Sequence, residues 1–389
     1  MAAARDFDIV VFGATGFTGE LTAAYLAEHA PDGTRWALAG RSTSKLEAVR
    51  LRLAAINPAL ADLPLLHADV SDPASIAAVA ASTKVVITTV GPYLQYGEPL
   101  VAACAEAGTD YVDLTGEPEF VDLMYVAYHD KAVASGARIV HACGFDSIPH
   151  DLGAFFTVNQ LPSGEKIDLR GLVRSGAQFS GGTFHSAMGA MSRQAQAAKA
   201  LKARRQKEGR PEGRKVRTVA GKPGRDRVLG WYRLPMPTID PLIVVRSAAA
   251  LPSYGPDFSY SHFAGIKTLR YTIGGSLAVG SMVVAANIAP LRNALKKRIK
   301  QGEGPSESRR AKSWFTVDFI GEAAGTTVHT RVSGGDPGYS ETSKMLAESA
   351  LCLAFDANPV TAGQVTTAAA MGDNLLARLQ KAGIRFETV

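Results

Sequence analysis

The residues best suited to bind a ligand form a glycine-rich turn, Gly13-Ala-Thr-Gly16-Phe-Thr-Gly19. This turn follows an apolar run at 7–12 and precedes a helical pattern, which is the context that a dinucleotide site requires. Gly13 allows a tight turn, Gly16 lets the backbone approach a pyrophosphate, and Gly19 lets the helix pack on the strand. The N–H groups and the dipole at the helix N-terminus attract phosphates. The residues predicted to bind the cofactor here are Gly13, Thr15, Gly16, Phe17, Thr18 and Gly19.

The residues after the second predicted strand decide between NAD(H) and NADP(H). NAD sites usually place a carboxylate there for the ribose 2′-hydroxyl, whereas this chain has Gly40-Arg41-Ser42. The Arg41 guanidinium can bind a 2′-phosphate through two hydrogen bonds, and the Ser42 hydroxyl can donate to it. We therefore expect NADP(H) rather than NAD(H). The alternative is that Arg41 is a solvated side chain at a loop edge.

Two further strand ends complete the predicted cofactor site. Asp69 ends the third strand, where its carboxylate could accept from the adenine amino group, while Asp72 caps the next helix. Gly91 and Pro92 follow the fourth strand, at the edge of the sheet that faces the nicotinamide. We expect Asp69, Gly91 and Pro92 to contact the cofactor.

Polar side chains at strand ends are the candidates for catalysis. Tyr93 follows the fourth strand, Glu117 the fifth, and Asp146 and His150 the sixth. A phenol, carboxyl or imidazole at this edge can donate a proton near the nicotinamide, whereas helix capping is the competing role. The sequence has no Tyr-x-x-x-Lys pair and no His-Glu-x-x-His motif, so no metal site is expected and the catalytic residue stays open.

The elements that position these residues alternate between strands and helices. Apolar, β-branched runs predict strands at 7–12, 36–39, 63–68, 85–89, 111–114 and 138–141, with helical patterns between them. Such βαβ units form a parallel sheet with helices on both faces. The fold class is therefore α/β, with a doubly wound Rossmann-type domain over 1–145.

The pattern changes after Gly144, where a second α+β domain of mixed or antiparallel sheet is expected over 146–339. Strands are predicted at 167–174, 242–245, 314–320 and 326–332, a helix over 184–205, and a polar basic loop within 199–227. Helices are predicted over 342–355 and 364–380. We expect this last part, residues 340–389, to pack back on the first domain.

Two basic segments stand out in a chain of net charge +6. Residues 199–227 hold 12 Lys and Arg against 3 Asp and Glu, and residues 292–312 hold 8 against 2. The second segment follows an uncharged run at 271–291, which is interpreted first as a buried core or interface helix. Docking on a membrane surface is the second interpretation and a true span the third. No nucleic-acid partner is expected.

Several strings together identify a family. They are Gly13-Ala-Thr-Gly-Phe-Thr-Gly19, Leu38-Ala-Gly-Arg-Ser42, Thr89-Val-Gly-Pro-Tyr93, Tyr111-Val-Asp-Leu-Thr-Gly-Glu117, Cys143-Gly-Phe-Asp-Ser-Ile-Pro149, Ser180-Gly-Gly-Thr183 and Gly335-Asp-Pro-Gly-Tyr339. The chain resembles the saccharopine dehydrogenase-like oxidoreductases and is more closely similar to the actinobacterial (mycobacterial) trans-acting enoyl reductases. The resemblance covers nearly the whole chain and is weakest over 200–310.

The resemblance implies an NADP-linked enoyl reductase. Its substrate would be a polyketide-type acyl chain held by a separate synthase, in the biosynthesis of cell-envelope lipids and glycolipids. A saccharopine-type amino or imino acid dehydrogenase and a non-catalytic nucleotide-binding scaffold at a lipid surface are the alternatives. A cytoplasmic location is expected, with peripheral contact through 271–300 to the inner face of the plasma membrane. The exact substrate, the stereochemistry and the oligomeric state, a homodimer included, stay open.

Overall fold

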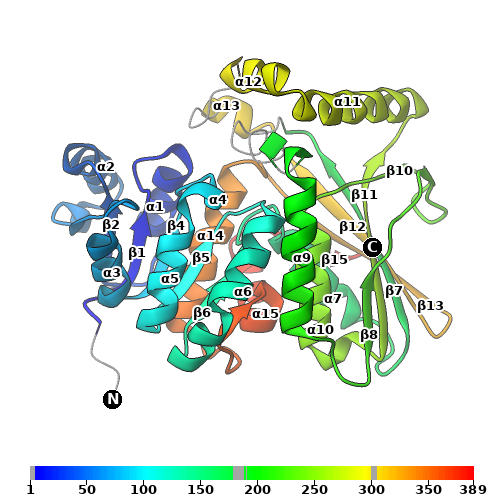
Figure 1. Cartoon of the computed structure of the whole chain (residues 1–389), viewed down its shortest axis with the longest axis horizontal. Coiled ribbons are helices and arrows are strands. Elements are labelled where there is room, and N and C mark those ends of the chain that lie inside the picture. Colours follow the sequence, from blue (N-terminus) through cyan, green and yellow to red (C-terminus); the bar gives the residue numbers. More distant parts are fainter. Residues whose placement is uncertain (1–4, 178–187, 190, 299–304) are drawn as a thin grey trace.

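Two β-sheets lie on opposite sides of the molecule, and helices fill the space between them (Figure 1). The computed structural model describes residues 5–177, 188–189, 191–298 and 305–389. The Ser-Gly-Gly-Thr turn at 180–183, the first part of the helix predicted over 184–205, and residue 300 lie outside the described residues.

The first sheet has seven parallel strands in the order β14-β6-β5-β4-β1-β2-β3. Their bounds are β1 Phe7–Phe12, β2 Trp36–Gly40, β3 Leu65–His67, β4 Thr83–Thr88, β5 Asp110–Asp113, β6 Arg138–Val140 and β14 Gly363–Val365. The order from β3 to β6 is that of a dinucleotide-binding fold, and the strand order reverses between β1 and β4. The predicted doubly wound domain is therefore confirmed. Strand β14 was not predicted.

Helices cover both faces of this sheet. Alternate side chains of β1 enter two separate cores, with Ile9 and Val11 in one and Val10 and Phe12 in the other. Burial on both faces explains why the strands are continuous apolar runs. The helices over the first core are α1 Phe17–His29, α2 Thr43–Ile56 and α14 Ser340–Phe355, and those over the second are α3 Pro73–Ser82, α5 Glu98–Ala107 and α6 Pro118–Ser135.

The second sheet is mixed and has eight strands. Strand β7 lies at its centre, parallel to β11 and antiparallel to β12. The strand bounds are β7 Ile167–Ser175, β8 Lys215–Thr218, β9 Gly224–Arg225, β10 Tyr232–Pro235, β11 Asp257–Ile266, β12 Phe315–Ala323, β13 Thr326–Gly334 and β15 Arg385–Thr388. The structure confirms the strands predicted at 167–174, 314–320 and 326–332.

Two predictions for the second domain were wrong. The run at 242–245 lies in helix α10, Asp240–Ala250, rather than in a strand. Pro241 stands in its first turn and the helix packs on β11, so tertiary contacts outweigh the β-branched composition. The prediction of a basic loop at 199–227 was wrong for part of that segment, which contains the end of helix α9, Gln194–Glu208, and the short strands β8 and β9. Strand β8 is charged because it pairs with β11 at an exposed position.

The two domains share contacts over much of their length. Helix α9 packs along α6, where Arg204 makes a buried ion pair with Asp122. Helix α7, Ile148–Val158, packs on β12 and β13, and α15, Thr367–Lys381, packs on α7. The C-terminal segment contacts both domains, because α14 covers the first sheet while β15 pairs with β13 of the second.

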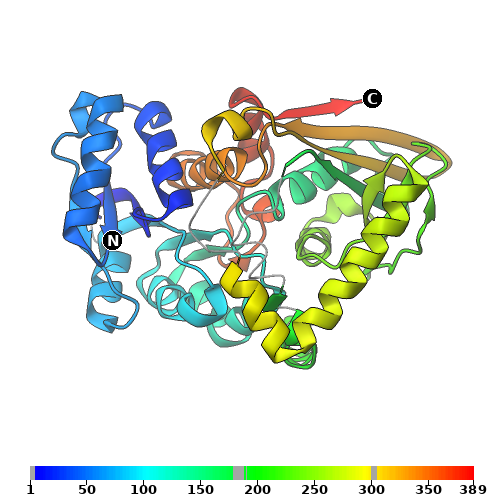
Figure 2. The same cartoon turned by 90° about the horizontal axis from the view of Figure 1, so that it is seen from above.

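The uncharged run at 271–291 lies mostly in helix α11, Leu269–Asn287, which is followed by α12, Ala289–Arg298. Seen from above, these helices form an open V over one end of the second domain (Figure 2). Large apolar side chains of the two helices and their ends are exposed, namely Leu269, Tyr271, Val284, Ile288 and Leu291. The described side chains therefore do not form a fully buried core helix, although Ala285 and Ala286 are buried, and the interpretation as an interface helix stays open. Among the described residues, no helix is long and apolar enough to cross a membrane.

Candidate functional site

The turn between β1 and α1 has the geometry of a phosphate-binding loop. Gly13 has φ +89°, and a Cβ there would lie 2.7 Å from Val90 Cγ2. A Cβ on Gly19 would lie 2.2 Å from the Gly13 carbonyl oxygen, so the helix can approach the strand only with glycine. A Cβ on Gly16 would meet no atom of the described residues closer than the Gly13 carbonyl oxygen at 3.4 Å, which leaves open space in front of this residue.

The N-terminus of α1 faces this open space without a side-chain cap. Gly16 is the N-cap residue with φ −83°, so Gly13 rather than Gly16 supplies the positive φ of the turn. The first backbone N–H groups of a helix have no partner within it. Phe17, Thr18 and Gly19 line the adjoining cavity, while Thr15 is exposed beside it. These residues therefore fit the pyrophosphate of a dinucleotide.

The structure brings Arg41, Ser42 and Asp69 to the same edge of the sheet. Arg41 is exposed just after β2, and Ser42 caps α2 by accepting a hydrogen bond from the Lys45 N–H. The Asp69 carboxylate accepts hydrogen bonds from the Ser71 N–H and hydroxyl, which lower the pKa of Asp69, and the charge of Arg41 lowers it further. The Asp69 carboxylate is thus already partnered, whereas Arg41 remains available to a 2′-phosphate.

The loop after β4 closes the other side of the cofactor crevice. The Thr89 hydroxyl donates to the Gly13 carbonyl, which ties this loop to the phosphate-binding turn. The Gly91–Pro92 peptide bond is cis, and both residues line the cavity. Gly91 and Pro92 therefore lie at the cavity near the switch point of the sheet, and their contact with a nicotinamide stays a prediction.

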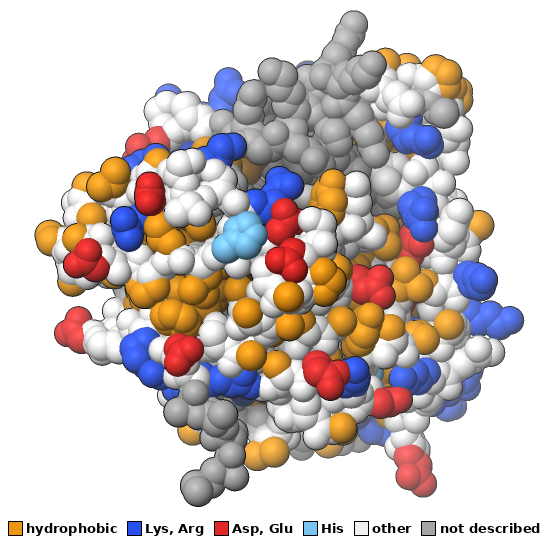
Figure 3. Space-filling view, turned by 60° about the vertical axis from the view of Figure 1, so that its left-hand side comes forward, with side chains coloured by type: hydrophobic (Ala, Val, Ile, Leu, Met, Phe, Trp, Pro, Cys, Tyr) orange, Lys and Arg blue, Asp and Glu red, His pale blue; other side chains and the backbone are white. Residues whose placement is uncertain are grey.

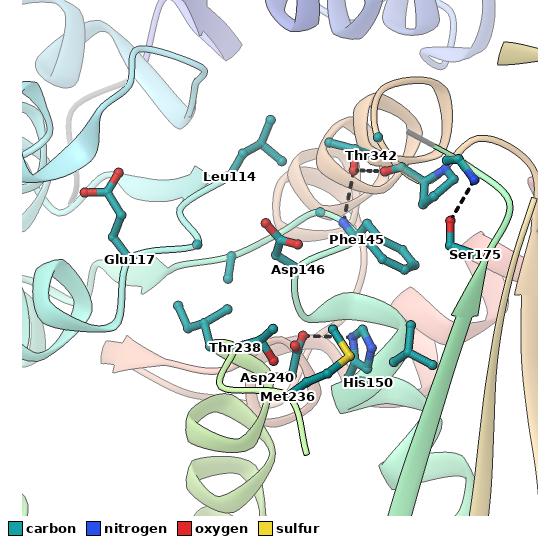
Figure 4. A pocket seen from close by; sticks show the side chains of 18 of the residues that line it. Leu114, Glu117, Phe145, Asp146, His150, Ser175, Met236, Thr238, Asp240 and Thr342 are labelled. Carbon is teal, nitrogen blue, oxygen red and sulfur yellow. Dashed lines mark hydrogen bonds and ion pairs between the residues drawn. The ribbon is translucent and has the colours of Figure 1, made fainter. Parts of the chain in front are cut away.

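Tyr93 and Glu117 have structural partners. The Tyr93 hydroxyl donates to the Thr88 carbonyl and accepts from the Leu114 N–H, and burial raises the pKa of Tyr93 well above its ordinary value. The two Glu117 oxygens accept from the N–H groups of Tyr93 and Leu94, which begin the short helix α4, Tyr93–Tyr96. Figure 4 shows the Glu117 carboxylate directed away from Asp146. Both side chains therefore hold loops in place.

Asp146 lies in the cavity at the end of β6 (Figure 4). Burial raises the pKa of Asp146 to about 6, and the negative charge of Asp240 adds to the rise. Among the described residues, no group donates a hydrogen bond to its carboxyl. A carboxyl that is partly protonated near neutral pH and faces a cavity has the properties of a general acid.

His150 is the fourth catalytic candidate, and it lies next to two residues that the sequence did not single out. Its Nδ1 atom is 2.9 Å from Oδ1 of Asp240, and Nε2 of His262 is 3.5 Å from Oδ2 of the same carboxylate. Burial lowers the pKa of His262 to about 4 and thereby keeps its ring neutral. These residues come from α7, α10 and β11, so no local spacing could have revealed the cluster.

These residues line one cavity of about 1180 Å³ between the two domains. One end is formed by the phosphate-binding turn and the Gly91–Tyr93 loop, and the other by the second sheet, including Val173 and Arg174. The guanidinium of Arg174 lies 4.6 Å from the ring centroid of Trp231 and 5.3 Å from that of Trp314. The cavity exceeds the ~300–1,000 Å³ typical of a single ligand site, so a cofactor and a second molecule can both fit.

Comparisons with known proteins agree with this geometry. Residues 9–140 match the family model of the saccharopine dehydrogenase NADP binding domain. A candidate trans-acting enoyl reductase of Mycobacterium tuberculosis is 40% identical over 100% of this chain and 98% of its own length. A trans-acting enoyl reductase of Mycobacterium leprae is 36% identical over 99% of this chain and 98% of its own length.

One solved structure shows the same fold over both domains. The apo saccharopine dehydrogenase (L-Glu forming) of Saccharomyces cerevisiae gives a TM-score of 0.57 at 12% identity, covering 98% of this chain and all of its own. The predicted cofactor, NADP(H), is confirmed by the family of the first domain. Since the mycobacterial relatives match along nearly their entire length, the chain belongs to the family of the trans-acting enoyl reductases, oxidoreductases with an NADP-binding domain of the saccharopine dehydrogenase type.

Proposed function

We propose that this protein uses NADPH to reduce the carbon–carbon double bond of an enoyl thioester. The observation that carries the proposal is the continuous cavity, which joins the phosphate-binding turn to the second sheet and contains the Asp146 carboxyl. The names of the full-length relatives support the same reaction. Because these names include "trans-acting", we further propose that a separate synthase carries the acyl chain. The family resemblance leads us to propose that this synthase is of the polyketide type and serves cell-envelope lipids.

The lining of the cavity favours an acyl chain over an amino acid. Val173, Ala264 and Ile266 contribute apolar side chains from β7 and β11. Of the lysines and arginines in the described part of the chain, only Arg174 and Lys267 line the cavity. A saccharopine-type substrate carries several carboxylates and needs a compact set of cations, whereas an acyl chain gains free energy from apolar contacts.

Asp146 is the proposed proton donor. NADPH, when bound, supplies the hydride that the β-carbon of the enoyl group takes up. The α-carbon must then receive a proton, and the Asp146 carboxyl faces the cavity with no competing hydrogen-bond donor in the part of the chain that the structure describes. Its pKa of about 6 leaves a usable protonated fraction near neutral pH. Tyr93 is a weaker candidate because two backbone groups already occupy its hydroxyl.

The test compares substrate classes with purified protein. We expect NADPH oxidation with a 2-enoyl pantetheine thioester, and none with the saturated thioester or with an imino acid. Gly16→Val serves as a control that should remove cofactor binding and turnover together. Reduction of the imino acid alone would establish the amino acid dehydrogenase alternative. NADPH binding without turnover of any thioester would support the scaffold alternative instead.

We also propose peripheral contact with an anionic membrane, such as the inner face of the plasma membrane, through residues 271–300. Helices α11 and α12 expose Val284, Ile288 and Leu291. Directly after the uncharged run at 271–291, the sequence has five basic residues within nine positions, namely Arg292, Lys296, Lys297, Arg298 and Lys300. Each basic residue near an anionic surface contributes about 1 kcal/mol. By contrast, positive and negative side chains are interspersed over the side of the first domain (Figure 3).

Liposome flotation tests this contact. We expect binding to vesicles with anionic lipid that weakens with salt and with glutamate at positions 296, 297 and 298. The control carries the same charge change on α9, at the exposed Lys199, Lys202 and Arg205. No flotation at low salt, or equal loss in both variants, would contradict the proposal. A dimer that dissociates on Val284→Asp would instead assign the exposed apolar side chains to a subunit interface.

A further inference from the structure

His150, Asp240 and His262 form a buried cluster in the wall of the cavity. Their exposed fractions are 2%, 3% and 5%, and each comes from a different element, namely α7, α10 and β11. Each residue offers one ligand atom, and these atoms all lie within 4.8 Å of one another. Two imidazoles and a carboxylate are a donor set that transition metals prefer.

The polar atoms of this cluster are close together, and His150 forms an ion pair with Asp240 (Figure 4). His150 Nδ1 is 2.9 Å from Asp240 Oδ1, and His262 Nε2 is 3.5 Å from Asp240 Oδ2. His150 Nδ1 and Nε2, Asp240 Oδ1 and His262 Nε2 are nevertheless buried without a hydrogen-bond partner. Buried polar atoms in folded proteins rarely lack a partner, and a bound ion can supply the one that is missing.

The separations also suit a shared ion. In a tetrahedral site with bonds of about 2.0–2.1 Å, ligand atoms lie roughly 3.3 Å apart. The two separations of 2.9 and 3.5 Å lie on either side of this value and end on different oxygens of Asp240, and the ligand atoms of the three residues all lie within 4.8 Å of one another. Small movements of the His150 and His262 rings, which pack edge to face at 5.0 Å, would complete the geometry.

A second contact orients one of the ligands. The hydroxyl of Tyr260 lies 3.1 Å from Nδ1 of His262, so the Nε2 atom is the one turned toward Asp240. Metal-binding histidines commonly use their other ring nitrogen for such an orienting hydrogen bond. Tyr260 is itself buried in the core of the second domain and therefore holds the ring in place.

We propose that His150, Asp240 and His262 bind one divalent transition-metal ion, of the Zn²⁺ type, in the wall of this cavity. All three residues line the cavity, so the fourth coordination position faces it and can take an oxygen ligand from water or a bound molecule. Three protein ligands with one open position distinguish such a site from a closed structural one. The proposal does not depend on which substrate the protein reduces.

Metal binding by the full chain tests this directly. Chelator-treated protein is titrated with Co²⁺, whose visible absorption reports four-coordinate binding, and then with Zn²⁺ in competition. We expect one ion per chain and displacement of Co²⁺ by Zn²⁺. Asp240→Asn and His262→Gln should each weaken binding by more than about a hundredfold, because even partners outside the first shell contribute ~10–100-fold.

The control is His329→Gln. His329 also pairs with a buried carboxylate, with its Nε2 atom 2.8 Å from Asp318 Oδ1, but among the described residues it belongs to no group of three potential ligands. This variant should bind the ion as the wild type does. If wild-type protein develops no four-coordinate Co²⁺ spectrum, the cluster is an ion pair without a metal and the proposal is wrong. That result does not depend on whether any variant folds.

Discussion

Replacing Arg41 by alanine tests how the protein chooses its cofactor. Arg41 lies just after β2, exposed at the edge where an adenosine ribose would lie. Among the described residues no carboxylate forms an ion pair with it, and the neighbouring Asp69 is bound to Ser71. The 2′-phosphate of NADP(H) would therefore be the principal partner of Arg41. NAD(H) lacks this phosphate and would gain no ion pair there.

The size of the effect follows from this exposure. A hydrogen bond to a charged group contributes ~1.5–3 kcal/mol, which is roughly ten- to a hundredfold in affinity. Since Arg41 is exposed and salt screens the interaction, we expect a value nearer the lower figure. The affinity for NADP(H) should therefore fall roughly tenfold in Arg41→Ala, while the affinity for NAD(H) should not change.

Calorimetric titration of wild type and Arg41→Ala with both cofactors measures these affinities. Arg52→Ala is the matched control, because Arg52 is an exposed arginine on the neighbouring helix that pairs with Glu20. It should leave both affinities unchanged. Equal binding of NAD(H) and NADP(H) by wild type, or an equal loss for both cofactors in Arg41→Ala, would refute the reasoning.

Three further predictions concern the cofactor turn, the proton donor and stability. Gly16→Val should abolish NADPH binding. Its melting temperature should equal that of wild type, because the added Cβ meets no atom of the described residues closer than 3.4 Å. Normal NADPH binding by this variant would show that the turn has only a structural role. In chelator-treated protein, kcat/KM should fall about tenfold per pH unit above the Asp146 pKa of about 6, since only the protonated acid is active. The Asp146→Asn variant should lose both this pH dependence and most of the activity. If its pH profile of kcat/KM equals that of wild type, Asp146 is not the proton donor. Burial raises the pKa of Asp8, but Arg35 and Lys84 outweigh this effect and lower the pKa to about 2. Ionised Asp8 therefore stabilises the fold above pH 4, and this contribution is lost as the pH falls toward 2. Urea unfolding at pH 7 should therefore show Asp8→Asn less stable by about 1 kcal/mol, because solvent screens the half-exposed Arg35 and Lys84, and this difference should shrink as the pH falls toward 2. An equal deficit at both pH values would contradict the linkage.

The first domain was predictable because its signals are local. The strand, turn and helix around Gly13–Gly19 follow one another in the sequence, and so do Arg41 and the strand before it. Strand β14 could not be predicted, since three residues from the C-terminal segment join the sheet only through pairing with β6. The helix at 240–250 was missed because its β-branched composition favours a strand and only its packing decides otherwise.

The candidate site was predictable only in part, because sequence gives the position of a side chain but not its partner. Tyr93 and Glu117 follow strand ends as Asp146 does, yet both are occupied by backbone groups. Asp146 differs because none of the described residues donates a hydrogen bond to its carboxyl. The link from His150 to Asp240 and His262 depends on how α7, α10 and β11 pack together.

The central claim is that this chain transfers hydride from NADPH to an enoyl thioester. The most direct test uses NADPH deuterated at the transferable position of its nicotinamide, a 2-enoyl pantetheine thioester, and mass spectrometry of the product. We predict a saturated thioester that carries one deuterium, located on the β-carbon, while the α-carbon gains its hydrogen from solvent. An unreduced thioester in the presence of bound NADPH, or deuterium found at the α-carbon, would contradict it.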